Sequence, residues 1–219
     1  DAQTPCAVPL ALGIVSEQNR PALSERLATT VSSPRTGDDG KTYPPYSLTT
    51  GFAGCSWISL ALSDNGYTAE AYRQLLSRQF PSFLYPVTQG ATTIWERLNS
   101  MTHQDGFGGN NSMNSFNHYA FGSVANWLMQ RSLGIARDET SPGFLHFSLR
   151  PEPDPTGTLQ YARGHYDSMY GRIESSWSRQ ADGTIRYEFT IPANTSATLL
   201  LPGRDAVELE SGHHQINKF

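Results

Sequence analysis

Hydrophobic residues follow helical spacing along the first part of the chain. Leu23, Leu27 and Val31 recur every four positions. Asn19 precedes them as a possible N-cap, and Pro21 suits the first helical turn. The same spacing predicts three further helices, at about residues 54–64, 68–76 and 115–131. Short links separate these segments, so we expect helical hairpins that pair as in a toroid.

The hydrophobic period changes to two near residue 140. Alternating, β-branched and aromatic positions then predict strands at residues 144–149, 159–163, 171–177, 184–191 and 197–201. Asp182 and Gly183 form a hairpin-turn signal between two of these strands. We therefore expect an α + β protein of two domains, with helices over residues 1–138 and an antiparallel β-sandwich over residues 139–219.

Two glycine-bounded segments carry the candidate chemistry. Residues 90–97 read Gly-Ala-Thr-Thr-Ile-Trp-Glu-Arg, and residues 115–122 read Ser-Phe-Asn-His-Tyr-Ala-Phe-Gly. A carboxylate beside an indole suits a sugar site, because the ring covers the apolar face of a sugar and the carboxylate does acid/base work. An arbitrary glutamate is usually solvated. Because Ile94 and Trp95 make this segment apolar, we expect Glu96 to be buried, and a buried carboxylate must be paired or used.

Both segments resemble signature sequences of the bacterial α-L-rhamnosidases, glycoside hydrolase family 78. The resemblance continues at residues 49–54, Thr-Thr-Gly-Phe-Ala-Gly, and at residues 72–76 and 81–86. Leu98 departs from the family pattern, in which relatives often carry a second tryptophan. The resemblance implies that the helical part is the latter half of an (α/α)6 toroid. It also implies that the chain is a fragment, with a larger portion of the same polypeptide upstream of Asp1.

The resemblance further implies an activity and a division of roles. The intact enzyme would hydrolyse terminal α-L-rhamnose from glycosides or polysaccharides with inversion, using water and no cofactor. Glu96 matches the general base, His118 matches a histidine that contacts the sugar, and Trp95 would stack on the ring or shape the subsite. The general acid would lie upstream of Asp1, so the isolated fragment is expected to be inactive.

Two readings from other classes stay open beside the enzyme. A non-catalytic carbohydrate-binding module would use the aromatic residues to hold a sugar that is never cut. A Glu96 on the open surface would favour that module, whereas a buried Glu96 favours the enzyme. An interaction scaffold would need a large exposed aromatic patch.

Composition narrows the remaining classes of partner. The chain has 219 residues, and 16 Lys and Arg stand against 20 Asp and Glu, which argues against a surface that neutralises nucleic-acid phosphates. The longest apolar run is far short of the roughly 20 residues of a membrane span. Cys6 and Cys55 are expected to be buried thiols, and His213 and His214 have too few possible partners for a metal site. A secreted, periplasmic or cytoplasmic bacterial protein would fit.

Overall fold

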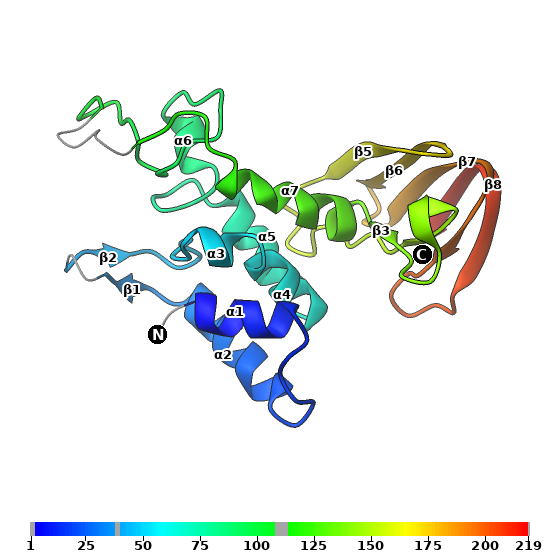
Figure 1. The fold of residues 1–219 in the computed structure, drawn as a ribbon, viewed down its shortest axis with the longest axis horizontal. Coiled ribbons are helices and arrows are strands. Elements are labelled where there is room, and N and C mark those ends of the chain that lie inside the picture. The colour runs from blue at the N-terminus through cyan, green and yellow to red at the C-terminus, as the bar shows by residue number, and fades with distance from the viewer. Residues whose placement is uncertain (1–2, 38–39, 108–113, 219) are drawn as a thin grey trace. The chain divides into compact units, whose positions relative to one another are not determined.

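A computed structural model describes residues 3–37, 40–107 and 114–218 (Figure 1). The chain divides into two compact units, residues 1–124 and residues 125–219, here called the helical unit and the β unit. The first sheet strand, β3 (Ile135–Arg137), begins before the expected domain boundary. The predicted boundary after residue 138 stays a prediction.

Four helices that pack on one another form the centre of the helical unit: α1 (Thr4–Ala11), α2 (Arg20–Ser32), α4 (Ile58–Asp64) and α5 (Thr68–Leu76). Shorter elements complete it: β1 (Arg35–Thr36), β2 (Thr42–Tyr43), α3 (Phe52–Cys55), α6 (Tyr85–Thr88) and the 3-10 turn η1 (Ala120–Ser123). The predicted repeat in α2 is confirmed, because Leu27 and Val31 are buried. Asn19 takes the N-cap position, although its side chain makes no capping hydrogen bond.

The helix expected at 54–64 is divided in two. Residues 52–55 form α3, and a new helix, α4, begins at Ile58. Gly54 lies so close to Thr4 and Thr50 that a Cβ atom would collide with both side chains. Close packing at Gly54 therefore fixes where α3 lies, and a turn at Trp57 separates it from α4.

The continuous helix expected at 115–131 is wrong. Residues 115–119 are irregular, and they are followed by η1, then α7 (Val124–Trp127) and the π-helical turn η2 (Leu128–Ser132). The carbonyl groups of Ser115 and Phe116 accept hydrogen bonds from Glu96 N and Thr93 Oγ1. These two carbonyl groups pair with a segment distant in sequence, so they do not accept the hydrogen bonds that a helix over residues 115–119 would require.

The β unit contains one sheet of six strands among the residues described: β3, β4 (His146–Leu149), β5 (Tyr161–Ser168), β6 (Gly171–Arg179), β7 (Ile185–Leu199) and β8 (Val207–Lys218). The order is β3-β4-β7-β6-β5, with β8 also paired to β7. The expected antiparallel pairing holds except between β4 and β7, which run parallel. Hydrogen bonds connect these strands into one sheet rather than the two separate layers expected.

The long strand β7 joins two predicted strands. Its first half pairs with β6, its second half pairs with β4, and β8 follows both halves with a register shift between Ile191 and Ser196. Asn194 has a left-handed φ of 61° within this shift, a conformation that Asn tolerates better than most residues. The predicted turn at Asp182 and Gly183 is confirmed, because Gly183 has a φ of 86° and Asp182 accepts a hydrogen bond from Thr184 N.

Alternating side chains of the sheet build a continuous core. The fully buried rings of Trp177, Tyr187, Phe147 and Phe189 form its centre. Trp177 Nε1 donates to Ser132 O at 2.9 Å, so the one polar atom of this indole is satisfied. Elsewhere, Cys6 and Cys55 are both buried and free, as expected. Within the described ranges, helices long and apolar enough to cross a membrane are absent.

Candidate active site

Two irregular segments of the helical unit lie side by side, and they are the two segments that carry the sequence motifs. Glu96 N donates to Ser115 O at 2.8 Å, and His118 N donates to Ile94 O at 2.8 Å. Thr93 Oγ1 adds a bond to Phe116 O. The chain therefore brings the predicted carboxylate and the predicted imidazole into one local structure, although about twenty residues separate them in sequence.

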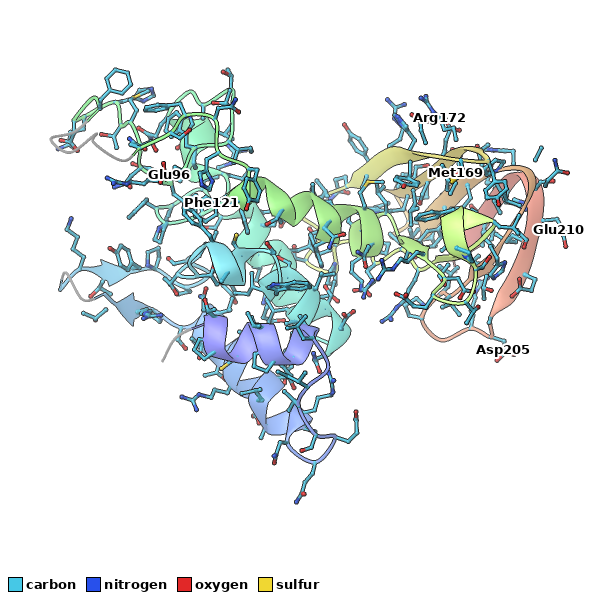
Figure 2. The ribbon with its side chains drawn as sticks, viewed as in Figure 1. Glu96, Phe121, Met169, Arg172, Asp205 and Glu210 are labelled. Atoms are coloured by element: carbon cyan, nitrogen blue, oxygen red, sulfur yellow. The ribbon has the colours of Figure 1, made fainter. Side chains whose placement is uncertain are left out.

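A hydrogen bond holds one of the two carboxylate oxygens of Glu96, the side chain labelled in Figure 2. Its Oε2 accepts a hydrogen bond from Ser115 N at 2.7 Å, so the Glu96 and Ser115 pair is joined in both directions. Within the described part of the chain, Oε1 receives no hydrogen bond. The side chain is half-buried rather than enclosed. One oxygen is thus fixed, and the other is available to a water molecule.

His118 lies between two aromatic rings. Its imidazole stacks on Phe52, with ring centroids 4.6 Å apart, and on Tyr119 at 5.5 Å. Nδ1 accepts a hydrogen bond from Ala120 N at 3.2 Å. The proton of a neutral imidazole therefore resides on Nε2, and this N–H can donate to a ligand hydroxyl.

Trp95 is buried, as the apolar character of its segment suggests, whereas Ile94 is exposed. Trp95 is 5% exposed and packs edge-to-face on Phe116, with centroids 5.4 Å apart. The ring of Trp95 is therefore part of the packed interior beside the motif and is not open to solvent. The burial expected for Ile94 is wrong, because this side chain is 45% exposed. It lies near Gly122, where a Cβ atom would be 3.4 Å from Ile94 Cγ1.

Neighbouring elements hold the two segments in place. Buried Ser100 has its hydroxyl 2.6 Å from Asn114 Oδ1, and Asn114 Nδ2 donates back to Ser100 O. On the other side, the thiol of Cys55 donates to Ala120 O at 3.3 Å and so connects α3 with η1. Polar bonds at both ends therefore fix segments that have little regular structure.

Exposed rings around the motifs complete the site. Tyr119 is 86% exposed, although the predicted helix would have placed it on an apolar face. Phe52 is also exposed, and it contacts Phe121 edge-to-face at 5.6 Å as well as His118. Sequence reasoning did not select Phe52 as a site residue. The signal was present, because Phe52 lies in the segment 49–54 that extended the family resemblance.

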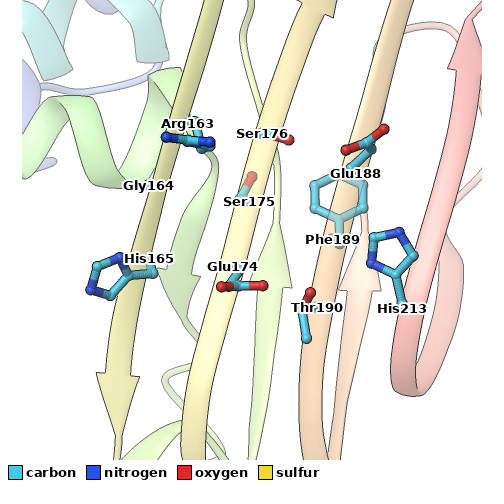
Figure 3. Close-up of a pocket in the computed structure, with 10 residues that line it drawn as sticks. All are labelled: Arg163, Gly164, His165, Glu174, Ser175, Ser176, Glu188, Phe189, Thr190 and His213. Atoms are coloured by element: carbon cyan, nitrogen blue, oxygen red, sulfur yellow. The ribbon is translucent and has the colours of Figure 1, made fainter.

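A second concave surface lies in the β unit, across strands β5 to β8 (Figure 3). This polar groove has a volume of about 560 Å³. Strand register places four of its side chains in one row: His165, Glu174, Thr190 and His213. Clusters of three or more His, Cys, Asp or Glu side chains suited to a metal are absent from residues 3–37, 40–107 and 114–218.

The helical unit thus presents a carboxylate, an imidazole and exposed aromatic rings on neighbouring segments. Residues 1–131 match the bacterial alpha-L-rhamnosidase 6 hairpin glycosidase domain, and residues 134–216 match the bacterial alpha-L-rhamnosidase C-terminal domain. The chain therefore belongs to the bacterial α-L-rhamnosidase family.

Individual relatives agree with this assignment. The chain is 32% identical over 213 residues to an α-L-rhamnosidase of Streptomyces avermitilis, a match that covers 97% of this chain and 19% of the relative. It is 33% identical over 208 residues to an α-L-rhamnosidase of Formosa agariphila, covering 95% and 21%. The chain thus spans about a fifth of the length of the curated relatives it matches.

Solved structures give the same result. The crystal structure of the Streptomyces avermitilis α-L-rhamnosidase complexed with L-rhamnose aligns with a TM-score of 0.85 at 30% identity, covering 99% of this chain and 21% of that one. The α-L-rhamnosidase of Aspergillus terreus aligns with a TM-score of 0.86 at 32% identity, covering 99% and 24%.

Proposed function

We propose that this chain supplies the general-base side of the active site of an inverting α-L-rhamnosidase. Such an enzyme removes terminal, non-reducing α-L-rhamnose from glycosides or polysaccharides. The observation that carries the proposal is the carboxylate of the half-buried Glu96, which is anchored through Oε2 while Oε1 is available to water. A base that must accept a proton from water needs this combination of a fixed position and an accessible oxygen.

The proposed reaction needs two carboxyl groups. Glu96 Oε1 takes a proton from a water molecule as that water attacks the anomeric carbon, and a carboxylic acid on the opposite side protonates the departing oxygen. In inverting glycosidases the two groups are roughly 6.5–9.5 Å apart, which leaves room for the water. We assign the acid to a part of a longer polypeptide, since the relatives are about five times the length of this chain.

The other two predicted site residues receive different roles. His118 donates its Nε2 proton to a sugar hydroxyl, a role supported by the bond from Ala120 N that occupies Nδ1. Trp95 shapes the floor of the subsite, a role that suits its buried ring. Exposed Tyr119 is then the ring with a face available to the sugar.

The proposed function also implies an architecture for the two units. We expect the helical hairpins to be part of an (α/α)6 toroid that other helices of a longer chain complete. We also expect β7, whose pairing changes from β6 to β4 across the register shift between Ile191 and Ser196, to fold the single sheet over its own core as a sandwich does.

A non-catalytic carbohydrate-binding module is the second candidate. The exposed rings of Tyr119, Phe52 and Phe107 favour it, because such modules hold sugars by ring stacking. The buried ring of Trp95 counts against it. Turnover distinguishes the two candidates, because a binding module has no step that depends on a basic Glu96.

The test is steady-state kinetics on the complete enzyme that contains this chain. Glu96→Gln keeps an oxygen that accepts from Ser115 N but removes the basic form, so kcat should fall by roughly 10²–10⁴ while KM changes little. Glu25→Gln, at an exposed position of α2, is the matched control and should keep wild-type turnover. Wild-type kcat in Glu96→Gln would contradict the assignment.

The division of roles also predicts the behaviour of residues 1–219 alone. Without the proposed acid, the chain should turn over p-nitrophenyl α-L-rhamnoside negligibly, since general-acid catalysis contributes about 10²–10⁴ in rate. Robust activity of residues 1–219 that Glu96→Gln abolishes would mean that the acid lies within this chain.

A further inference from the structure

The β unit has a pocket of about 390 Å³ at the end of its sheet, well away in sequence from the motifs of the candidate active site. The loop between β3 and β4, which includes the 3-10 turn η3 (Pro142–Phe144), forms one wall. The turn between β5 and β6 forms the other, and Met169 lies in this turn (Figure 2). The Met169 Sδ and Tyr170 Cε2 atoms would lie 3.7 and 3.6 Å from a Cβ atom at Gly143, so the turn packs over η3.

Aromatic and thioether groups make the inner wall. The rings of Phe144 and Tyr166 are 4.6 Å apart and tilted by 39°, and Phe144 also contacts the fully buried Phe147. Tyr166 is 42% exposed, and Met169 is 89% exposed. The wall is therefore rigid at Phe144 and open toward solvent at the other two side chains.

The backbone at this wall is strained. Phe144 has a φ of 66°, a left-handed conformation that is a genuine outlier for a bulky residue. Such a conformation persists only where the surroundings fix it, and it is concentrated at ligand sites and other functional positions. Here the contacts of Phe144 with Tyr166 and Phe147 hold the ring in the pocket wall.

Polar groups surround the opening. Asp138 accepts hydrogen bonds from Thr140 N and Thr140 Oγ1, at 2.8 and 2.7 Å, and these bonds hold the pKa of its carboxyl below the usual value. Arg137 Nε donates to Glu139 Oε1 at 2.8 Å. Charges of both signs and the hydroxyl of Ser141 thus lie beside the aromatic wall.

We propose that this pocket is a non-catalytic carbohydrate site that holds one neutral sugar ring of a glycan chain. The rings and the thioether take the apolar face of the sugar, and the carboxylates, the guanidinium and the hydroxyl pair with its hydroxyl groups. Rim charges of opposite sign select against a strongly charged ligand. The choice of a rhamnose-containing glycan as the source of that ring rests on the proposed function.

The polar groove of Figure 3 is a weaker candidate for the same ligand. The aromatic ring of Phe189, which borders it, is fully buried in the core. Ser175 Oγ likewise points to the core side, where it donates to Leu133 O. A sugar in that groove would exchange hydrogen bonds with water for hydrogen bonds with the protein and gain no ring contact, so little net affinity would result.

The experiment is an NMR titration of the ¹⁵N-labelled 219-residue chain with methyl α-L-rhamnoside. A single sugar ring has few atoms to contribute affinity, so we expect saturable binding in the millimolar range. Amide shifts should concentrate at residues 143–144 and 166–170. The absence of saturable shifts at these residues would overturn the proposal.

Two tyrosines of β5 give a matched pair of variants. Tyr166→Ala should weaken binding at the pocket by about tenfold or more, because the sugar loses its stacking surface. Tyr161→Ala should leave that binding unchanged, since Tyr161 is 68% exposed and lies on the opposite face of the same strand. Met169→Ala serves as the second variant if Tyr166→Ala does not fold, and it should weaken binding by a few fold.

Two further outcomes would distinguish sugar binding in the pocket from self-association and from sugar binding near Glu96. Shifts at residues 143–144 and 166–170 that grow with protein concentration in the absence of sugar would identify a second copy of the chain as the occupant, and the proposal would be wrong. Sugar-dependent shifts around Glu96 and His118 that persist in Tyr166→Ala would support the proposed function alone. The sugar-dependent shifts at the pocket residues should persist in Glu96→Gln, and their loss in that variant would contradict the pocket proposal.

Discussion

The helical unit and the β unit hold their candidate ligand surfaces in different ways. In the helical unit the motif residues lie on irregular segments that are joined by a few polar bonds, and the rings of these segments range from the buried Trp95 to the exposed Tyr119. In the β unit the aromatic pocket is attached to a sheet whose alternate side chains form a continuous core. In both units, therefore, contacts fix the position of the candidate ligand surface, as catalysis and binding both require, but polar bonds do so in the helical unit and apolar packing does so in the β unit.

The largest effect is expected when the centre of the β core is removed, which tests whether the sheet depends on this core. Trp177→Ala deletes a fully buried indole and its bond to Ser132 O, so the free energy of unfolding of the β unit should fall by about 3–5 kcal/mol. Hydrogen exchange of the β6 and β7 amides measures this change. Ser176→Ala, at the adjacent position on the opposite face, is the control and should change it by less than about 1 kcal/mol. A similarly small loss in Trp177→Ala would mean that the sheet does not depend on this core.

A smaller effect is expected at alkaline pH. Burial raises the pKa of Tyr187 to about 12, whereas an unfolded tyrosine ionises near pH 10. Between these values the unfolded chain releases the phenol proton and the folded chain keeps it. The contribution is therefore complete below about pH 10, and the free energy of unfolding falls by up to about 2.7 kcal/mol as the pH rises to 12.

Urea unfolding at several pH values provides the measurement. Tyr187→Phe should remove this part of the pH dependence, and Tyr161→Phe, at an exposed ring, should retain it. Equal alkaline slopes in the wild type and in Tyr187→Phe would show that Tyr187 ionises without resistance from the fold.

The smallest effect is expected at the hydrogen bond between Glu96 and the Ser115 amide. Glu96→Ala removes the acceptor of Ser115 N, so exchange of the Ser115 amide hydrogen should accelerate by about fivefold, which corresponds to about 1 kcal/mol. Glu96→Gln should leave this exchange almost unchanged, because the amide oxygen still accepts. If both variants accelerate exchange equally, Glu96→Gln also disturbs the local structure, and its kinetic effect cannot be assigned to the lost base alone.

Sequence patterns predicted the elements in which local preference and packing agree. The repeat in α2 and the alternation in β6 both place apolar residues in a core, so period and burial coincide. Strand β8 was missed because most of its residues are exposed and polar, and its pairing with β7 depends on backbone hydrogen bonds. The helix at 115–131 was wrong for a related reason, since Tyr119 is apolar at a surface position instead of a buried one.

The sequence selected candidate site residues whose roles stay a prediction, and it did not predict how those residues are arranged. The two motifs identified Glu96 and His118 from residue types and family resemblance. The reciprocal bonds between Glu96 and Ser115 were not predictable, because they join segments that no periodicity relates. The exposure of Ile94 likewise depends on how those segments pack.

Proton NMR of the sugar first released by the complete enzyme tests the central claim most directly. If Glu96 activates water on the face opposite to the leaving group, the first product is β-L-rhamnose, and the α-anomer appears only later by mutarotation. Glu96→Gln should then release this β-anomer at a rate reduced by roughly 10²–10⁴. Initial release of α-L-rhamnose would contradict the account, because retention requires a carboxylate that attacks the sugar itself instead of a base that activates water.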